Sequence, residues 1–122
     1  MPTPTEAADN RFILDARELS EGQFREAEIN NQGSTRWLVL TRNKGRVRAW
    51  LNVCPHAGRA LNWAPDKFLT DPSGNLVCSA HGAVFEPERG ECLSGPCRGA
   101  ALTAVAVEER DGVIRVSSGD PA

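Results

Sequence analysis

Two short stretches, CPHAG at residues 54–58 and CSAHG at residues 78–82, contain both histidines of the chain and half of its four cysteines. In each stretch a cysteine precedes the histidine, by two positions in the first and by three in the second. A glycine closes each stretch, and glycine permits the backbone conformations of a tight loop. Two such loops, each offering one sulfur and one nitrogen, predict a metal site with four ligands. The candidate ligands are Cys54, His56, Cys78 and His81.

Two kinds of metal centre fit two cysteines and two histidines. Zinc would take all four side chains in one tetrahedron. A 2Fe-2S cluster would divide them, with both cysteines on one iron and both histidines on the other. A cysteine and a histidine separated by one residue are close for ligands of a single ion, and this spacing suits ligands of two different irons better. The ligand types and their spacing alone do not decide between zinc and a 2Fe-2S cluster.

Composition narrows the classes of protein. The chain has 122 residues, 40% of them hydrophobic, which is enough for one domain with one modest core. Its 14 basic and 16 acidic residues give a net charge of −2, which argues against a basic nucleic-acid-binding protein. No apolar stretch has the length of a membrane helix, and the first residues lack the pattern of a signal peptide. We therefore expect a cytoplasmic protein whose cysteines are metal ligands or thiols.

Short apolar runs separated by turns predict an all-β domain. The runs at residues 37–41 and 47–51 flank a turn at 42–45, which predicts a hairpin. A second hairpin is expected from the runs at 102–107 and 113–116, which flank an Asp-Gly turn. Further strands are expected at 12–14 and from 24 to 29, with short fragments at 76–78 and 83–85 and one helical turn at 15–19. The region from 52 to 100 is rich in glycine, proline and asparagine, so we expect it to be dominated by loops.

These motifs resemble those of Rieske 2Fe-2S proteins. Residues 54–58 are similar to the first cluster loop of that family, residues 78–85 to the second, and residues 90–96 to a proline-bearing loop that covers the cluster. The likeness extends over residues 11–117, beyond a flexible tail at 1–10. It implies an all-β fold with a sandwich or barrel base and a small, loop-rich cluster-binding subdomain at about residues 54–98.

The resemblance also implies roles for the four candidate ligands. Cys54 and Cys78 would hold the buried iron of one 2Fe-2S cluster, and His56 and His81 would hold the outer iron. The implied function is that of a small soluble Rieske ferredoxin, a monomer that takes one electron from a reductase and passes it to a terminal oxygenase or a similar enzyme. We expect neither nucleic acid nor a membrane among its partners.

The same features predict an electron-transfer component and not an enzyme. A mononuclear iron site needs two further histidines, and a nucleotide-binding domain needs a glycine-rich fingerprint; the chain has neither. Two alternatives remain: a small Rieske subunit fixed to a larger reductase, as in nitrite-reductase-like systems, or a zinc-stabilised interaction module.

Two features are left unassigned. Cys92 and Cys97 flank the expected cover loop and are expected to be ordinary thiols, or a labile disulfide if their Cα atoms lie within about 7 Å; neither is assigned as a ligand.

Residues 31–50 carry five basic side chains and no acidic ones. They predict a solvated hairpin face or a docking patch for an acidic partner. The five are Arg36, Arg42, Lys44, Arg46 and Arg48.

We predict a midpoint potential in the lower part of the Rieske range, roughly −150 to 0 mV. High-potential members of the family carry an extra cysteine in each cluster loop, where this chain has Arg59 and Ala80. They also have a serine and a tyrosine that donate hydrogen bonds to sulfur, where this chain has Ala83 and Phe85. Fewer donors stabilise the reduced cluster less. A redox titration followed by visible absorption measures the potential, and a midpoint well above 0 mV would contradict the argument.

Overall fold

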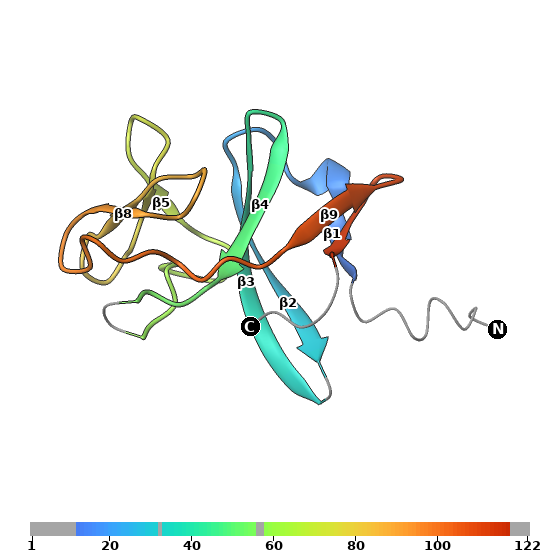
Figure 1. Cartoon of the computed structure of the whole chain (residues 1–122), viewed down its shortest axis with the longest axis horizontal. Coiled ribbons are helices and arrows are strands. Elements are labelled where there is room, and N and C mark those ends of the chain that lie inside the picture. Colours follow the sequence, from blue (N-terminus) through green and yellow to red (C-terminus); the bar gives the residue numbers. More distant parts are fainter. Residues whose placement is uncertain (1–11, 32, 56–57, 118–122) are drawn as a thin grey trace.

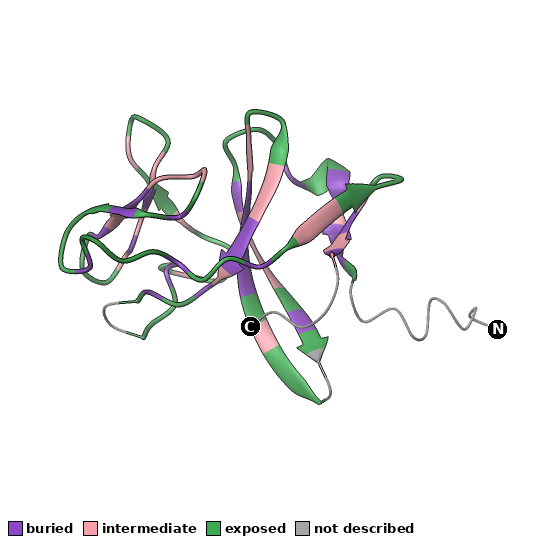
Figure 2. Ribbon diagram, in the orientation of Figure 1, coloured by how far each residue is buried: buried purple, intermediate pink, exposed green. Residues whose placement is uncertain are grey.

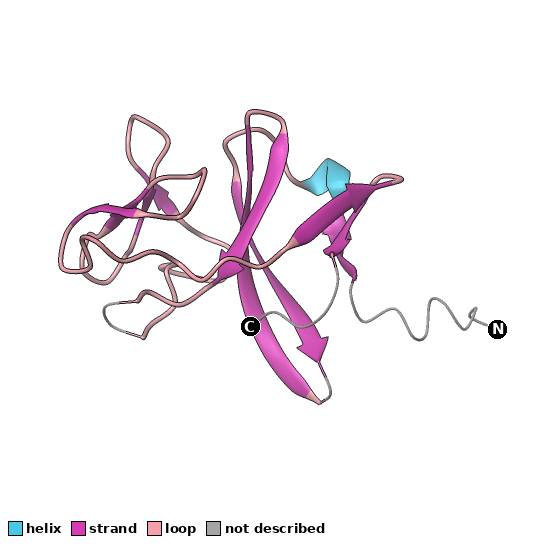
Figure 3. Cartoon of the chain, in the orientation of Figure 1, coloured by secondary structure: helices cyan, strands magenta, loops and turns pink. Residues whose placement is uncertain are grey.

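The computed structural model describes residues 12–31, 33–55 and 58–117, so the predicted tail at residues 1–10 lies outside the described residues. The described segments form ten strands and one short 3-10 helix, which confirms the all-β prediction (Figures 1 and 3). None of the helical residues described forms a span that could cross a membrane. The elements are β1 Phe12–Asp15, η1 Ala16–Glu18, β2 Phe24–Asn31, β3 Ser34–Asn43, β4 Arg46–Leu51, β5 Leu69–Thr70, β6 Leu76–Val77, β7 Val84–Phe85, β8 Cys92–Ser94, β9 Val107–Arg110 and β10 Val113–Val116.

The strands form three antiparallel sheets. Strands β2, β3 and β4 form a central meander, with the sheet β1-β10-β9 on one side and the short-stranded sheet β5-β6-β7-β8 on the other (Figure 1). Both predicted turns form hairpins, one between β3 and β4 and the other between β9 and β10. Their turns, Lys44-Gly45 and Asp111-Gly112, have positive φ at both positions, as the turn that matches the twist of paired strands requires.

Strand β3 is buried on both faces. Successive side chains of a strand point to opposite faces of the sheet. Leu38 and Leu40 accordingly pack in one core with the sheet β1-β10-β9, whereas Val39 packs in a second core with the sheet β5-β6-β7-β8. All three are fully buried. Figure 2 shows the middle of the central meander coloured as buried. Strand β4 divides its residues in the same way, with Ala49 in the first core and Trp50 in the second. We call these the base core and the loop core.

The prediction of a strand at residues 102–107 is wrong for most of that range, because β9 begins only at Val107. The backbone hydrogen bonds of this segment go to two different partners. Leu102 N–H donates to the Gly90 carbonyl (2.9 Å), whereas Val105 N–H donates to the Ala49 carbonyl (2.9 Å). Because one segment cannot follow both neighbours in a regular ladder, it runs between the two ends of the molecule as an irregular connection.

The Arg42 guanidinium joins the central sheet to the base. Its Nη1 and Nη2 atoms donate to the two carboxylate oxygens of Glu109 on β9, at 2.8 and 3.0 Å, and its Nε donates to the Leu19 carbonyl at 2.9 Å. The Arg42 side chain is only 16% exposed. It therefore does not belong to the solvated basic face that was predicted for residues 31–50.

We predict that Glu109→Gln lowers the free energy of unfolding at pH 7 by about 0.5 kcal/mol, a small value because the carboxylate is 35% exposed and screened by solvent. The hydrogen bonds from Arg42 lower the pKa of Glu109 below its ordinary 4.5. Its contribution is thus present above pH 4.5 and is lost as the pH falls through the lower folded-state pKa. Urea unfolding at several pH values measures this loss.

The exposed Glu28 on β2 provides the control. Glu28→Gln makes the same substitution at a carboxylate that does not bond to Arg42, so it should lower the free energy of unfolding at pH 7 by less than Glu109→Gln does. If Glu109→Gln changed the stability equally at pH 7 and at pH 2.5, the ion pair would not be the cause.

Candidate metal centre

The first cysteine loop is closed by two backbone hydrogen bonds. The Cys54 N–H donates to the Arg59 carbonyl at 2.7 Å, and the Gly58 N–H donates back to the Cys54 carbonyl at 2.8 Å. Gly58 has φ +68°, a left-handed conformation that side chains disfavour. The loop therefore turns back on itself at the glycine that the sequence places four residues after the cysteine.

The second cysteine loop repeats this geometry. The Cys78 N–H donates to the Ala83 carbonyl at 2.7 Å, and the Gly82 N–H donates to the Cys78 carbonyl at 2.9 Å, with Gly82 at φ +74°. The partners stand five and four residues after the cysteine, as they do in the first loop. The two stretches are thus the same backbone motif used twice.

The structure brings Cys54 and Cys78 together in the loop core, where they are 0% and 1% exposed. Burial raises the pKa of the Cys78 thiol above its ordinary 9.0; N–H groups of His81 and Ala80 that bond to its sulfur lower the pKa, and the neighbouring Cys54 thiol raises it further. Backbone donors aimed at a sulfur stabilise its thiolate, which is the form that binds metals. Two adjacent buried sulfurs with such donors suit the cysteine side of an iron–sulfur cluster.

The two histidines are placed differently from the cysteines. His81 lies in the second loop and is exposed, three residues after the fully buried Cys78. His56 lies outside the described residues. Within the described part of the chain, no three histidine, cysteine or acidic side chains are arranged to hold a metal ion. Three of the four predicted ligands are therefore described, the buried cysteine pair and the exposed His81, and the four-ligand set stays a prediction.

A cover loop packs directly on the second cysteine loop. A Cβ atom at Gly95 would lie 2.8 Å from the Ala83 Cα, closer than side chains allow, so the contact requires glycine. The Arg98 N–H donates to the Gly95 carbonyl at 3.1 Å and keeps the turn closed. Ala83 directly follows the end of the CSAHG stretch. The cover loop, defined as residues 93–96 between the two remaining cysteines, therefore lies on the second cysteine loop.

The two remaining cysteines lie beside the cover loop in the same core. Cys92 and Cys97 are 6% and 7% exposed, and their sulfur atoms are 2.9 Å apart. Burial, followed by the adjacent Cys92 sulfur, raises the pKa of the Cys97 thiol to about 12. In the described structure both are thiols that face each other across the loop.

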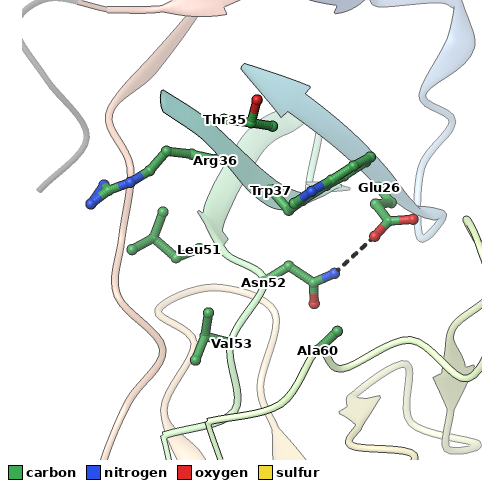
Figure 4. Close-up of a pocket in the computed structure, with 8 residues that line it drawn as sticks. All are labelled: Glu26, Thr35, Arg36, Trp37, Leu51, Asn52, Val53 and Ala60. Carbon is green, nitrogen blue, oxygen red and sulfur yellow. Dashed lines mark hydrogen bonds between the residues drawn. The ribbon is translucent and has the colours of Figure 1, made fainter. Parts of the chain in front are cut away.

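Sequence reasoning missed Asn52, a buried polar residue that holds the ends of the first cysteine loop. Its Oδ1 accepts from the Leu61 N–H at 2.9 Å, and its Nδ2 donates to Asn62 Oδ1 at 2.9 Å. Its Nδ2 also donates to Glu26 at 3.3 Å, the bond that is dashed in Figure 4. These bonds connect β2, the end of β4 and the exit of the loop. The available signal was an asparagine at the end of an apolar strand, two residues before Cys54.

A surface hollow of about 500 Å³ adjoins the first cysteine loop. Val53 and Ala60, which flank that loop, line one part of it, and Trp37 and Arg36 of β3 line another (Figure 4). None of the described residues that line it is a cysteine or histidine. The hollow therefore borders the candidate metal centre, and its described lining contains none of the predicted ligands.

An all-β domain that buries two cysteines in matched loops and exposes a histidine beside them has the features of an iron–sulfur electron-transfer domain. A family model described as Rieske [2Fe-2S] domain matches residues 10–114, and the chain belongs to this family. Its cofactor is therefore a 2Fe-2S cluster, and its role lies in electron transfer. The sulfur chemistry of the two loops fits that cofactor, and the match favours it over the zinc centre left open above.

Known proteins show the same fold in two contexts. The ferredoxin of carbazole 1,9a-dioxygenase from Nocardioides aromaticivorans IC177 is 19% identical with a TM-score of 0.67, covering 92% of this chain and 100% of that one. The terminal oxygenase of the same system is 24% identical with a TM-score of 0.68, covering 93% of this chain and 32% of that one. At these identities the likeness establishes the fold.

A curated relative is the methanesulfonate monooxygenase hydroxylase subunit alpha of Methylosulfonomonas methylovora. It is 36% identical over 76 residues, and the match covers 57% of this chain. The match spans only 17% of that relative's length. The relative thus shares part of this domain within a much longer chain.

We predict that Gly95→Ala destabilises the protein by about 2 kcal/mol more than Gly99→Ala. Both glycines have a left-handed backbone, with φ +102° and +96°, so both variants carry similar strain. Only the Cβ at position 95 meets another atom, the Ala83 backbone, because nothing lies within 4 Å at position 99. Thermal and urea unfolding of both variants measure the difference. Equal destabilisation would show that the cover loop does not press on the second cysteine loop.

Proposed function

We propose that this chain is a one-electron carrier of the Rieske ferredoxin type, which accepts an electron from a reductase and delivers it to a terminal oxygenase or a similar enzyme. In this proposal Cys54 and Cys78 ligate the inner iron of the cluster, and His56 and His81 ligate the outer iron. The observation that carries the proposal is the pair of matched loops, which bury both cysteine sulfurs and leave His81 exposed.

The buried cysteines shield the cluster site from water, whereas the exposed His81 makes its edge accessible to a partner protein. Burial of the cysteine pair keeps water away from the sulfurs, and the N–H groups of Ala80 and His81 stabilise negative charge on Cys78. The 2Fe-2S cluster, when bound, supplies a centre that changes its charge by one electron. Because electron tunnelling falls steeply with distance, a partner must approach the edge where the cluster lies nearest to solvent. The exposed His81 lies at that edge.

Exposed residues of the neighbouring loops extend this edge into a docking surface. Arg59 closes the first cysteine loop and Pro96 lies in the cover loop, and both are exposed. A similar solved structure is a complex of reduced oxygenase and oxidized ferredoxin in carbazole 1,9a-dioxygenase, with a TM-score of 0.65 and 24% identity. It supports a partner of the oxygenase type for the edge formed by His81, Arg59 and Pro96.

We further propose that the chain does not itself transform a substrate. Its two histidines are both assigned to the cluster, which leaves none for a mononuclear iron site. The similarity to part of a monooxygenase subunit supports a second candidate, in which the domain works while fixed within a larger oxidoreductase. In both cases its residues carry electrons and the substrate chemistry occurs elsewhere.

The ligand assignment is tested with matched cysteine variants. Cys54→Ser and Cys97→Ser make the same substitution in the same buried core, but only Cys54 is a proposed ligand. We expect Cys54→Ser and His81→Ala to abolish the Rieske visible and EPR spectra, whereas Cys97→Ser retains them with equal amounts of iron and acid-labile sulfide. Loss of the spectrum in Cys97→Ser, or its retention in His81→Ala, would contradict the assignment.

The carrier role is tested by stopped-flow mixing of the reduced protein with an oxidised Rieske-type terminal oxygenase. We expect reoxidation that saturates with oxygenase concentration and that slows at least about tenfold in Arg59→Glu, because charge complementarity governs encounter. The spectrum and potential of Arg59→Glu report whether its cluster is intact. Co-purification with a large subunit, without transfer between free proteins, would favour the fixed subunit.

A further inference from the structure

We propose that Cys92 and Cys97 are a redox modification site, a thiol pair that oxidises to a disulfide across the base of the cover loop. Their sulfur atoms are 2.9 Å apart, and Cys97 Sγ donates a hydrogen bond to Cys92 Sγ. A disulfide bond is about 2.05 Å long, so the two atoms need to move only about 0.9 Å closer. This proposal goes beyond electron transfer and concerns the loop that covers the cysteine pair.

The backbone already holds both cysteines in position for this bond. The Cys92 N–H donates to the Ala100 carbonyl at 2.9 Å, and the Ala100 N–H donates to the Cys97 carbonyl at 2.9 Å. Ala100 thereby connects the two cysteine backbones from one side. A bond between the sulfurs would join two segments that these backbone hydrogen bonds already hold together.

Of the cysteines near Cys97, only Cys92 is available to form a disulfide with it when the cluster is bound. The Cys97 thiol also has Cys54 as a neighbour in the loop core. Cys54 is assigned to the inner iron, a step that rests on the proposed function, and a metal-bound sulfur is not free to form a disulfide. The pair Cys92–Cys97 thus remains available while Cys54 and Cys78 hold the cluster.

The oxidant of this step is a low-molecular-weight disulfide such as glutathione disulfide, which accepts two electrons from the two thiols. One cysteine sulfur attacks the disulfide and loses its proton, and one glutathione leaves as a thiol. The second sulfur then attacks the mixed disulfide, forms the Cys92–Cys97 bond and releases the second glutathione thiol. The protein loses two electrons and two protons, and both are recovered in the two thiols.

Access comes from the loop itself. Cys97 is buried, but the four residues of the cover loop before it are exposed, as are the three residues that follow. Segments with few buried contacts open locally more often than a core does. Because the same loop packs through Gly95 on the second cysteine loop, a disulfide at its base restricts the opening of the cover over the cysteine pair.

The cleavage pattern of trypsin allows a direct test. Cleavage after Arg89 and Arg98 releases residues 90–98, GECLSGPCR, which contain Cys92 and Cys97 alone, whereas Cys54 and Cys78 fall on the peptides 49–59 and 68–89. The holoprotein is equilibrated in glutathione buffers of increasing oxidation, quenched in acid, denatured, alkylated and digested. We expect the 90–98 peptide to change from two alkyl groups to none, with a mass lower by two hydrogens than that of the dithiol.

The outcomes separate this proposal from the electron-carrier function. If the 90–98 peptide takes up two alkyl groups in every buffer while the Rieske spectrum is normal, the proposed disulfide does not form. The bound cluster, and with it the basis of the electron-carrier proposal, is then unaffected. A disulfide between peptides 49–59 and 90–98 in the holoprotein would overturn both, because Cys54 would then not be a ligand.

A second measurement tests the closure of the loop. Oxidation should raise the unfolding temperature of the wild-type protein by roughly 5 °C, since the bond restricts the unfolded chain. Cys92→Ser and Cys97→Ser should show no dependence of unfolding temperature on the glutathione buffer. A wild-type protein that forms the bond without any rise in unfolding temperature would contradict the claim that the bond holds the cover loop closed.

Discussion

Strand β3 divides the apolar residues of the molecule between two cores. Leu38 and Leu40 face the base core and Val39 faces the loop core, and because the side-chain period of a strand is two, a shift of one residue would exchange them. The loop core contains all four cysteines, so the register of the central meander also determines where the cysteine loops are anchored. The candidate metal centre is therefore an extension of the sheet packing at one end of the domain.

The cysteine loops meet two hydrogen-bonding requirements that short strands alone do not meet. A sulfur pair in an apolar core needs donors for its negative charge, yet the backbone near it must also satisfy its own hydrogen-bonding groups. The matched pattern does both: the amide of each cysteine bonds five residues ahead, the glycine amide bonds back to the cysteine carbonyl, and intervening N–H groups of the second loop reach the Cys78 sulfur. The glycines are required because the return of the chain needs a left-handed residue.

Features encoded by neighbouring residues were predictable, and features that depend on distant contacts were not. The Asp-Gly hairpin and the Cys-His spacing are local, and the structure has the hairpin and places Cys54 beside Cys78. The family match confirms the Rieske resemblance and the 2Fe-2S cofactor that the spacing had left open against zinc.

Asn52 and Arg42 depend on partners far along the chain, Glu26 for the first and Glu109 for the second, and no local pattern indicates these pairs. The irregular course of residues 102–106 has the same origin, since its hydrogen bonds go first to Gly90 and then to β4. The position of His56 and the subdomain boundary at 54–98 stay predictions.

The pairing of β1 with β10 has a consequence for how such a domain is combined with others. These two strands, the first and the last described, are hydrogen-bonded neighbours in the base sheet, at the opposite end of the molecule from the cysteine loops (Figure 1). A polypeptide that enters at β1 and leaves at β10 can thus be inserted into a longer chain without crossing the cysteine loops. The same fold occurs in a ferredoxin and within a longer oxygenase chain, and in this chain both junctions would lie at the end away from the cysteine loops.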